Sequence, residues 1–185
     1  MCTGSSKSIS YYYFDLGKAE SELQTSFEKP RLEILPVMLP EYLNARGIAQ
    51  RIDQHRTVHA NWHLWASQPS SMLDRSALNY FEINLPNWFV TGAEEAWLSD
   101  NRPTLSDIVK LQFNLEHFNG GLDNNAELSG NWTLFDEKNK ILLRQNFSLS
   151  VVLEKDGYSG LASALQKGWE QLCHDISIQL LATIK

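Results

Sequence analysis

Three histidines form the clearest pattern of residues that could do chemistry. His55, His59 and His63 are spaced by four, and on a helix this spacing aligns three imidazoles along one face, as a zinc site requires. The surrounding segment is rich in residues that favour strands, and no carboxylate or cysteine completes the ligand set. We therefore expect a hairpin at this point, with surface histidines and no bound metal.

A second catalytic lead is the segment Gly157-Tyr158-Ser159-Gly160, which resembles the nucleophile elbow of hydrolases. That motif needs Gly-x-Ser-x-Gly between a strand and a helix, and here the second glycine comes one residue early. Ser159 is better interpreted as part of a helix start, where its hydroxyl can bond exposed backbone N–H groups. Residues 118–121 lack the spacing of phosphate-binding glycine loops and are predicted to be a turn. The sequence therefore predicts no catalytic residue and no enzyme.

Composition narrows the class of protein. The 185 residues carry a formal net charge of -6, with 43% hydrophobic and 21% charged residues, values typical of one soluble globular domain. Nucleic-acid binding depends on clustered Lys and Arg, and the sequence has no such cluster. The sequence contains no run of 18 or more uncharged apolar residues, so it predicts no membrane-spanning helix. Cys2 and Cys173 lie at opposite ends of the chain, so we expect no disulfide between them and a buried Cys173.

Short strands are predicted in the first third of the chain. Aromatic and branched residues favour a strand over residues 11–16 and a second over residues 32–39, where Pro36 indicates an edge position or a bulge. Residues 48–52 and 57–60 are predicted to form the two arms of a hairpin.

The middle of the chain predicts one helix followed by a buried strand. Ser71 is expected to cap the helix, with Asp74 in its first turn, and Pro86 to end it. Residues 88–90 then predict the strand. The buried face of the helix is expected to hold Leu73, Ala77, Phe81 and Leu85.

The strongest local pattern is alternation of apolar and polar residues over three later segments, with Gln145 as an exception in the third, which is typical of antiparallel strands covered on one face. Their inward residues are Val109, Leu111, Phe113 and Leu115, then Leu128, Gly130, Trp132 and Leu134, then Leu143, Phe147, Leu149, Val151 and Leu153. A helix over residues 158–184 follows, whose apolar stripe holds Tyr158, Leu161, Leu165, Trp169, Leu172, Ile176 and Leu180. The pattern predicts an α/β fold over residues 10–185, a single-domain sandwich of a mixed, largely antiparallel sheet covered by helices. Residues 1–9 are predicted to be a tether.

An ordered set of segments resembles the PqiC-like auxiliary lipoproteins of ABC-type and MCE-type transport systems. The segments are Tyr11-Tyr12-Tyr13-Phe14-Asp15-Leu16, Leu39-Pro40-Glu41-Tyr42-Leu43 leading to Ile48, Trp65-Ala66 ahead of a helix with Leu73, Phe118-Asn119-Gly120, Leu128-Ser129-Gly130-Asn131-Trp132-Thr133-Leu134 and Asp156-Gly157-Tyr158. The resemblance covers most of the chain. It implies a fold similar to the N-terminal domain of TolB.

The same resemblance implies a function and a location. It implies a non-enzymatic periplasmic lipoprotein that is anchored to the outer membrane through Cys2. Its implied partners are an MCE-domain protein that bridges the periplasm and an inner-membrane transport component, and it implies no cofactor. A precursor would carry a signal peptide before the cysteine. Because Met1 stands there instead, we expect this version to start at the mature end and to be soluble and unlipidated.

Two alternatives to a docking subunit remain open at this point. A lipid-carrying shuttle needs an apolar cavity large enough for acyl chains, and an envelope hydrolase needs a converging polar catalytic set. One further surface is predicted from helical phase, because Ile178 and Leu181 fall away from the apolar stripe of the last helix. Two interpretations are open: these residues are simply exposed near the end of the chain, or they contact a partner or a second copy of the chain.

Overall fold

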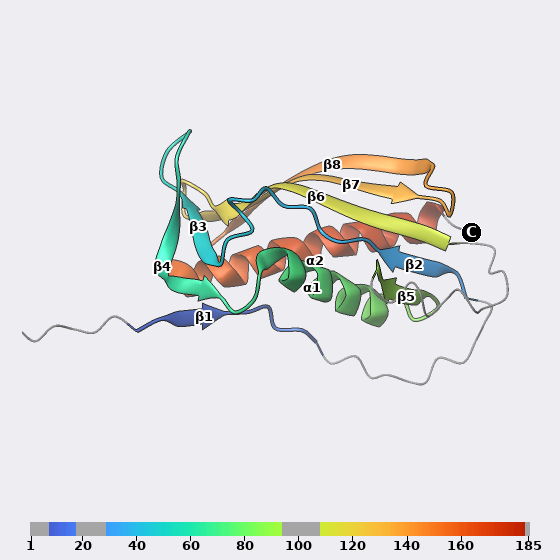
Figure 1. Ribbon diagram of the computed structural model, residues 1–185, viewed down its shortest axis with the longest axis horizontal. Helices are drawn as coiled ribbons and strands as arrows, with labels where there is room; N and C mark the ends of the chain where they lie inside the picture. Colours follow the sequence, from blue (N-terminus) through green and yellow to red (C-terminus); the bar gives the residue numbers. More distant parts are fainter. Residues whose placement is uncertain (1–7, 18–28, 94–107, 184–185) are drawn as a thin grey trace, which may run out of the picture.

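A mixed eight-stranded sheet with two helices on one of its faces forms the computed structural model, which describes residues 8–17, 29–93 and 108–183 (Figure 1). In chain order the elements are β1 (Ser10–Tyr12), β2 (Arg31–Ile34), β3 (Gly47–Arg51), β4 (Thr57–Trp65), α1 (Pro69–Asn84), β5 (Phe89–Gly92), β6 (Ile108–Gly120), β7 (Asn125–Phe135), β8 (Ile141–Val152) and α2 (Gly157–Thr183). The predicted fold class is confirmed. No helix of the described residues is long and apolar enough to cross a membrane.

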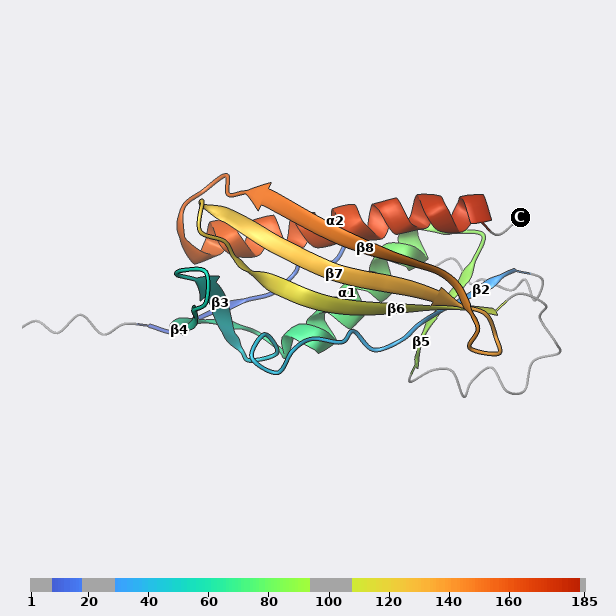
Figure 2. The same cartoon turned by 90° about the horizontal axis from the view of Figure 1, so that it is seen from above.

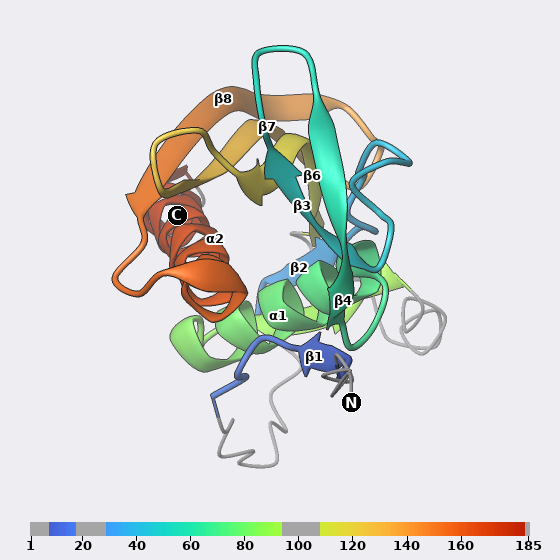
Figure 3. The same ribbon diagram turned by 90° about the vertical axis from the view of Figure 1, so that its left-hand side faces the viewer.

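The longest strand, β6, is the centre of the sheet. One of its edges pairs with β7, which pairs with β8, and both ladders are antiparallel. Its other edge pairs in parallel with β2 near its start and with β3 near its end. From β2 the sheet continues to β5, and from β3 to β4 and β1. Viewed from the end, the sheet curves around the two helices (Figure 3).

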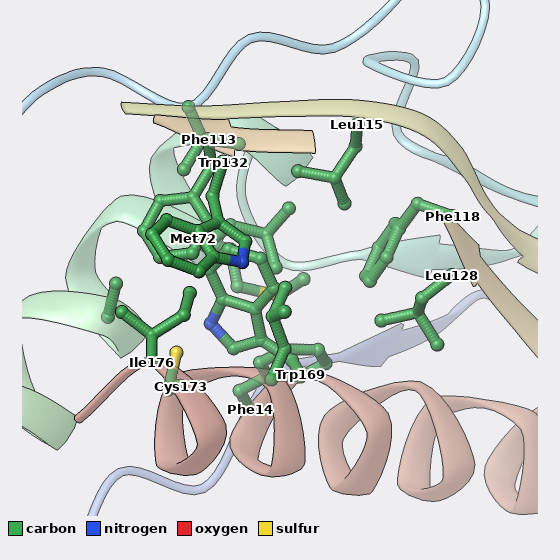
Figure 4. Packing of buried hydrophobic residues seen from close by; sticks show 14 of the residues in the cluster. Phe14, Met72, Phe113, Leu115, Phe118, Leu128, Trp132, Trp169, Cys173 and Ile176 are labelled. Atoms are coloured by element: carbon green, nitrogen blue, oxygen red, sulfur yellow. The ribbon is translucent and has the colours of Figure 1, made fainter. Parts of the chain in front are cut away.

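The predicted inward residues of β6 and β7 are buried, and those of the edge strand β8 are half-buried. Burial alternates along most of β6, whereas in β7 the outward Asn131 and Thr133 are buried as well. Helix α2 lies under this part of the sheet (Figure 2) and turns its predicted stripe toward it. Trp169 is fully buried with its ring 4.8 Å from that of Phe113, and Cys173 is buried beside it (Figure 4). Gly168 lets the helix approach β7, because a Cβ there would come 2.6 Å from Leu128 Cδ1.

The prediction for Pro36 is wrong with respect to an edge strand. β2 lies between β5 and β6, and it ends at Ile34. Beyond it, the N–H groups of Leu35 and Met38 donate to carbonyls of β6 at 2.9 Å each. Pro36 has no N–H to donate, and it sits in the irregular step between these two bonds. A proline can therefore follow an interior strand because it interrupts the ladder only after β2 has ended.

The start of α1 also differs from the prediction. The helix begins at Pro69, with Gln68 as its N-cap residue and no side-chain cap bond. Proline suits the first helical position because its fixed φ is already helical, so Ser71 is not the cap. Asp74 lies beyond the first turn, and its Oδ1 accepts a hydrogen bond of 2.6 Å from the N–H of Val37. The predicted buried face of α1 is confirmed.

Several strand boundaries differ from those predicted. The strand predicted over residues 32–39 ends at Ile34, and the one predicted over residues 88–90 is Phe89–Gly92. β1 covers only Ser10–Tyr12, whereas the prediction was residues 11–16. The second arm of the predicted hairpin continues to Trp65. Residues 118–120 belong to β6 and not to a turn, because they remain paired with β7 up to the register Gly120↔Ala126. The turn follows at residues 121–124.

We call the antiparallel ladder of β6, β7 and β8 the central ladder. Gly130 in β7 is the glycine on which this ladder depends most. It has a φ of +152°, and a Cβ there would come 2.1 Å from Asn114 O of β6. We expect Gly130→Ala to lower the free energy of unfolding by about 2 kcal/mol or more, measured by urea denaturation. Gly92→Ala is the matched control, because a Cβ at Gly92 meets nothing within 4 Å. Equal stability of the two variants would contradict this reading of the ladder.

The thiol of Cys173 is expected to be unreactive in the folded protein. Burial raises its pKa well above the ordinary value, and the reactive form of a thiol is the thiolate. In a Cys2→Ser variant, a coloured disulfide reagent should therefore detect no thiol before denaturation and one thiol after it. Rapid reaction of the folded variant would show that Cys173 is accessible.

Candidate functional site

The three histidines do not come together in the structure. His55 lies in the turn of the β3–β4 hairpin, as predicted, and the other two lie on β4. His59 Nε2 is 2.6 Å from Tyr42 O. His63 Nδ1 is 2.8 Å from the hydroxyl of Tyr12, and its ring stacks on that of Tyr158 at 4.4 Å. Two of the three therefore join segments that are distant in the sequence. Within residues 8–17, 29–93 and 108–183 no group of three or more His, Cys, Asp or Glu is placed to hold a metal ion.

The segment that resembles a nucleophile elbow begins α2. Gly157 takes a φ of +84° at the helix start, which glycine adopts without strain. A Cβ at Gly160 would come 1.6 Å from Lys155 O, so close packing accounts for this glycine. Ser159 lines a small polar hollow with Lys167, and Lys167 pairs with Glu154. The arrangement is that of a helix start, as predicted. Of the three histidines, His63 lies beside it, stacked on Tyr158.

The outer face of the sheet carries a polar cluster that the sequence did not predict. Arg51 and Glu127 form an ion pair of 2.7 Å, with each side chain about one quarter exposed. Beside it, His117 Nδ1 lies 2.8 Å from Ser129 Oγ. These residues border a hollow of about 280 Å³. Arg51 and Glu127 are 76 residues apart, so no spacing rule relates them.

A second hollow, of about 410 Å³, lies between α1 and the ends of β2 and β5. Its lining includes Ile34, Leu78 and Ala93 together with Asp74 and Arg75. This volume falls within the range of small-molecule sites, and the lining mixes apolar residues with an acid and a base.

The two residues predicted to contact a partner lie on the last turns of α2. Ile178 and Leu181 are 54% and 56% exposed, so the predicted helical phase is confirmed, whereas contact with a partner stays a prediction. The Tyr80 hydroxyl lies 3.2 Å from His174 Nδ1, so α1 and α2 lie side by side here. One turn further along α1, Ile83 is also exposed. We call Ile178 and Leu181 the helix-end surface.

The opposite end of the molecule receives the predicted tether. Cys2 lies outside the described residues, and the first described strand is β1. This strand lies beside the start of α2, since Tyr12 contacts His63 and His63 stacks on Tyr158. Asp15 is joined to Gln166 by two hydrogen bonds, of 3.0 and 2.9 Å. The chain therefore enters the domain at the first turns of α2, at the left of Figure 1.

Helix α2 separates these two ends. From Tyr158 to Ile178 the helix rises by about 30 Å, at 1.5 Å per residue. β1 lies near the start of α2, and the last turns of α2 lie at the other end of the molecule (Figure 1). An anchor at the first end would leave the second end free for a partner.

Known proteins resemble this chain in sequence and in fold. PqiC from Escherichia coli (strain K12), named as an intermembrane transport lipoprotein, is 26% identical over 178 residues, which cover 95% of this chain and 89% of that protein. The protein of the same name from Shigella flexneri matches equally. The crystal structure of an uncharacterized protein matches with a TM-score of 0.75 and 25% identity, covering 94% of this chain and 99% of that one. A crystal structure from Xanthomonas campestris, 13% identical with a TM-score of 0.74 over 94% of this chain and 95% of that one, supports the fold alone.

The family assignment covers most of the domain. Residues 14–177 match the family described as ABC-type transport auxiliary lipoprotein component. This span runs from the segment after β1 to the last turns of α2, and it includes every strand of the central ladder. The chain belongs to this family of transport auxiliary lipoproteins.

Proposed function

We propose that this chain is a lipid-anchored, non-enzymatic subunit that docks an intermembrane lipid transport system at the outer membrane. The observation that carries the proposal is that β1 lies beside the start of α2 and the helix-end surface lies on its last turns. A protein anchored at one end presents the other end to a partner about 30 Å away along the helix. The name of the relatives, intermembrane transport lipoprotein, supports this function.

The partners follow from the same proposal. The helix-end surface is exposed and apolar, as protein contacts often are, and it faces away from the proposed anchor. We propose that an MCE-domain protein, held by an inner-membrane component, contacts this surface in the periplasm. A second copy of the chain is the alternative occupant. In this role the subunit supports the integrity of the envelope.

A lipid shuttle is the second candidate function, and the hollow of about 410 Å³ beside α1 favours it. Purification of the protein from an envelope extract, followed by mass spectrometry under non-denaturing conditions, separates the two functions. A shuttle should retain about one lipid per chain, and Leu78→Trp, which fills the hollow, should remove it. A docking subunit should give the same mass before and after extraction of lipids.

The anchor is tested through Cys2. In the native precursor, Cys2→Ser should abolish incorporation of labelled palmitate and release the protein from the outer-membrane fraction, because stable anchoring requires more than one acyl chain on the protein. The wild-type precursor, expressed at the same level, is the control. A variant that still incorporates palmitate and still fractionates with the outer membrane would refute the lipidation of Cys2.

The helix-end surface is tested with Ile178→Gln/Leu181→Gln. Both side chains are exposed, so the free energy of unfolding should change by no more than about 0.5 kcal/mol for each. Association in analytical ultracentrifugation, or binding to the MCE-domain protein, should weaken. The matched control is Ile141→Gln/Leu142→Gln, because these residues of β8 are similarly exposed. If Ile178→Gln/Leu181→Gln assembled and bound as well as the wild type and the control variant, the helix-end surface would be removed from the proposal.

A further inference from the structure

Exposed aromatic side chains gather where β1 lies against β4. Tyr11, Tyr13 and Trp62 are 56%, 72% and 42% exposed, and Ile9 beside them is 47% exposed. We call these four residues the aromatic edge. Large aromatic side chains that are exposed on a protein surface leave much apolar area in contact with water. A group of them therefore indicates contact with another molecule or with a membrane.

The pairing of the strands explains why the four side chains share one side. β1 and β4 are parallel with the register Ser10↔His63 and Tyr11↔Leu64. The intervening residues point inward: Tyr12 bonds to His63, and Phe14 is buried with its ring 5.9 Å from that of Trp65. Side chains alternate along a strand, so the residues between these inward ones point outward.

The chemistry of the aromatic edge fits the surface of a bilayer. Tyrosine and tryptophan combine an apolar body with a polar tip, and they concentrate at the boundary between acyl chains and headgroups. The guanidinium of Arg46 lies 5.4 Å from the ring centre of Tyr11, and guanidinium groups bind phosphates. Arg46 is held in place because its Nε donates to Trp65 O at 3.1 Å. A positive charge therefore lies beside the aromatic rings.

The position of the aromatic edge selects the lipid surface over other occupants. Ile9 is seven positions after Cys2, so the two residues are at most about 25 Å apart in any conformation. An acyl anchor on Cys2 therefore holds the aromatic edge within reach of the bilayer. This step rests on the proposed function, because it takes Cys2 to be the anchored residue.

We propose that the aromatic edge is a second membrane contact, through which the folded domain sits on the surface of the bilayer that holds its anchor. A lipid tether alone leaves the domain free to rotate about the tether. Contact through β1 and β4 fixes that rotation. The helix-end surface, at the other end of α2, then points away from the membrane.

The test attaches the whole chain chemically to vesicles. Cys2 is coupled to maleimide-phosphatidylethanolamine in vesicles of phosphatidylethanolamine and phosphatidylglycerol; the burial of Cys173 directs the reaction to Cys2. Lipids brominated on their acyl chains quench nearby tryptophans, and the difference between wild type and Trp62→Phe gives the quenching of Trp62. We expect Trp62 to be quenched in the wild type, and Tyr11→Ser/Tyr13→Ser to lose most of that quenching. The matched control, Ile141→Ser/Leu142→Ser, should keep it, because the register Phe135↔Ile141 places these residues at the opposite end of the central ladder.

Tethering alone predicts a different result. If closeness to the bilayer were sufficient, Trp62 would be quenched equally in the wild type and in the double serine variant, and this would overturn the proposal. Absence of Trp62 quenching in the wild type would also overturn it. So would association of the uncoupled chain in ultracentrifugation that the serine changes abolish, because the aromatic edge would then be a contact between copies.

Two further measurements make the result independent of variant folding and of native lipidation. Coupling of the wild type should shield Trp62 from acrylamide in the water phase, and unchanged access of acrylamide would contradict the contact. The maleimide bond replaces any acyl group, so the vesicle result stands whether or not Cys2 carries lipid in the cell. Palmitate incorporation by the native precursor tests only the anchor, and the failures of the two proposals are therefore distinguishable.

Discussion

The packing of α2 against the inner face of β6, β7 and β8 is the contact on which the rest of the structure depends. A helix of 27 residues with an apolar stripe gains most of its stability from burial of that stripe. The contact is close at Gly168, where a side chain would meet Leu128, and Trp169 fills the space up to Phe113 (Figure 4). The sheet in turn depends on α2, because no other helix among the described residues is long enough to cover the inward side chains of β6, β7 and β8.

This contact also sets the functional geometry. Two other elements contact α2 at fixed points along its length. β1 lies near the start of α2, and the end of α1 lies near His174. β1 and the helix-end surface are consequently far apart. In the proposed function, α2 separates the membrane contact from the protein contact, because it spans the domain.

The residues that looked most chemical in the sequence have structural roles in the folded chain. His59 contacts the backbone of the segment before β3, and His63 joins β1 to α2 through Tyr12 and Tyr158. Gly160 permits close packing on Lys155. Each of these residues is explained without a substrate. The features that fit a function are instead surfaces, which agrees with the family of transport lipoproteins to which the chain belongs.

The sequence by itself determined which side of each long element is buried. Alternation over β6 and β7 and the stripe of α2 are local patterns, and burial follows their period. The order of the strands was decided only by the tertiary structure. β2 is four residues long, too short for its pattern to show that it lies inside the sheet, and Asp74 caps the backbone of Val37 rather than its own helix. The bonds between Asp15 and Gln166 join residues 151 positions apart. A local pattern records which side faces the core, whereas partners this distant are brought together only when the whole sheet closes over α2.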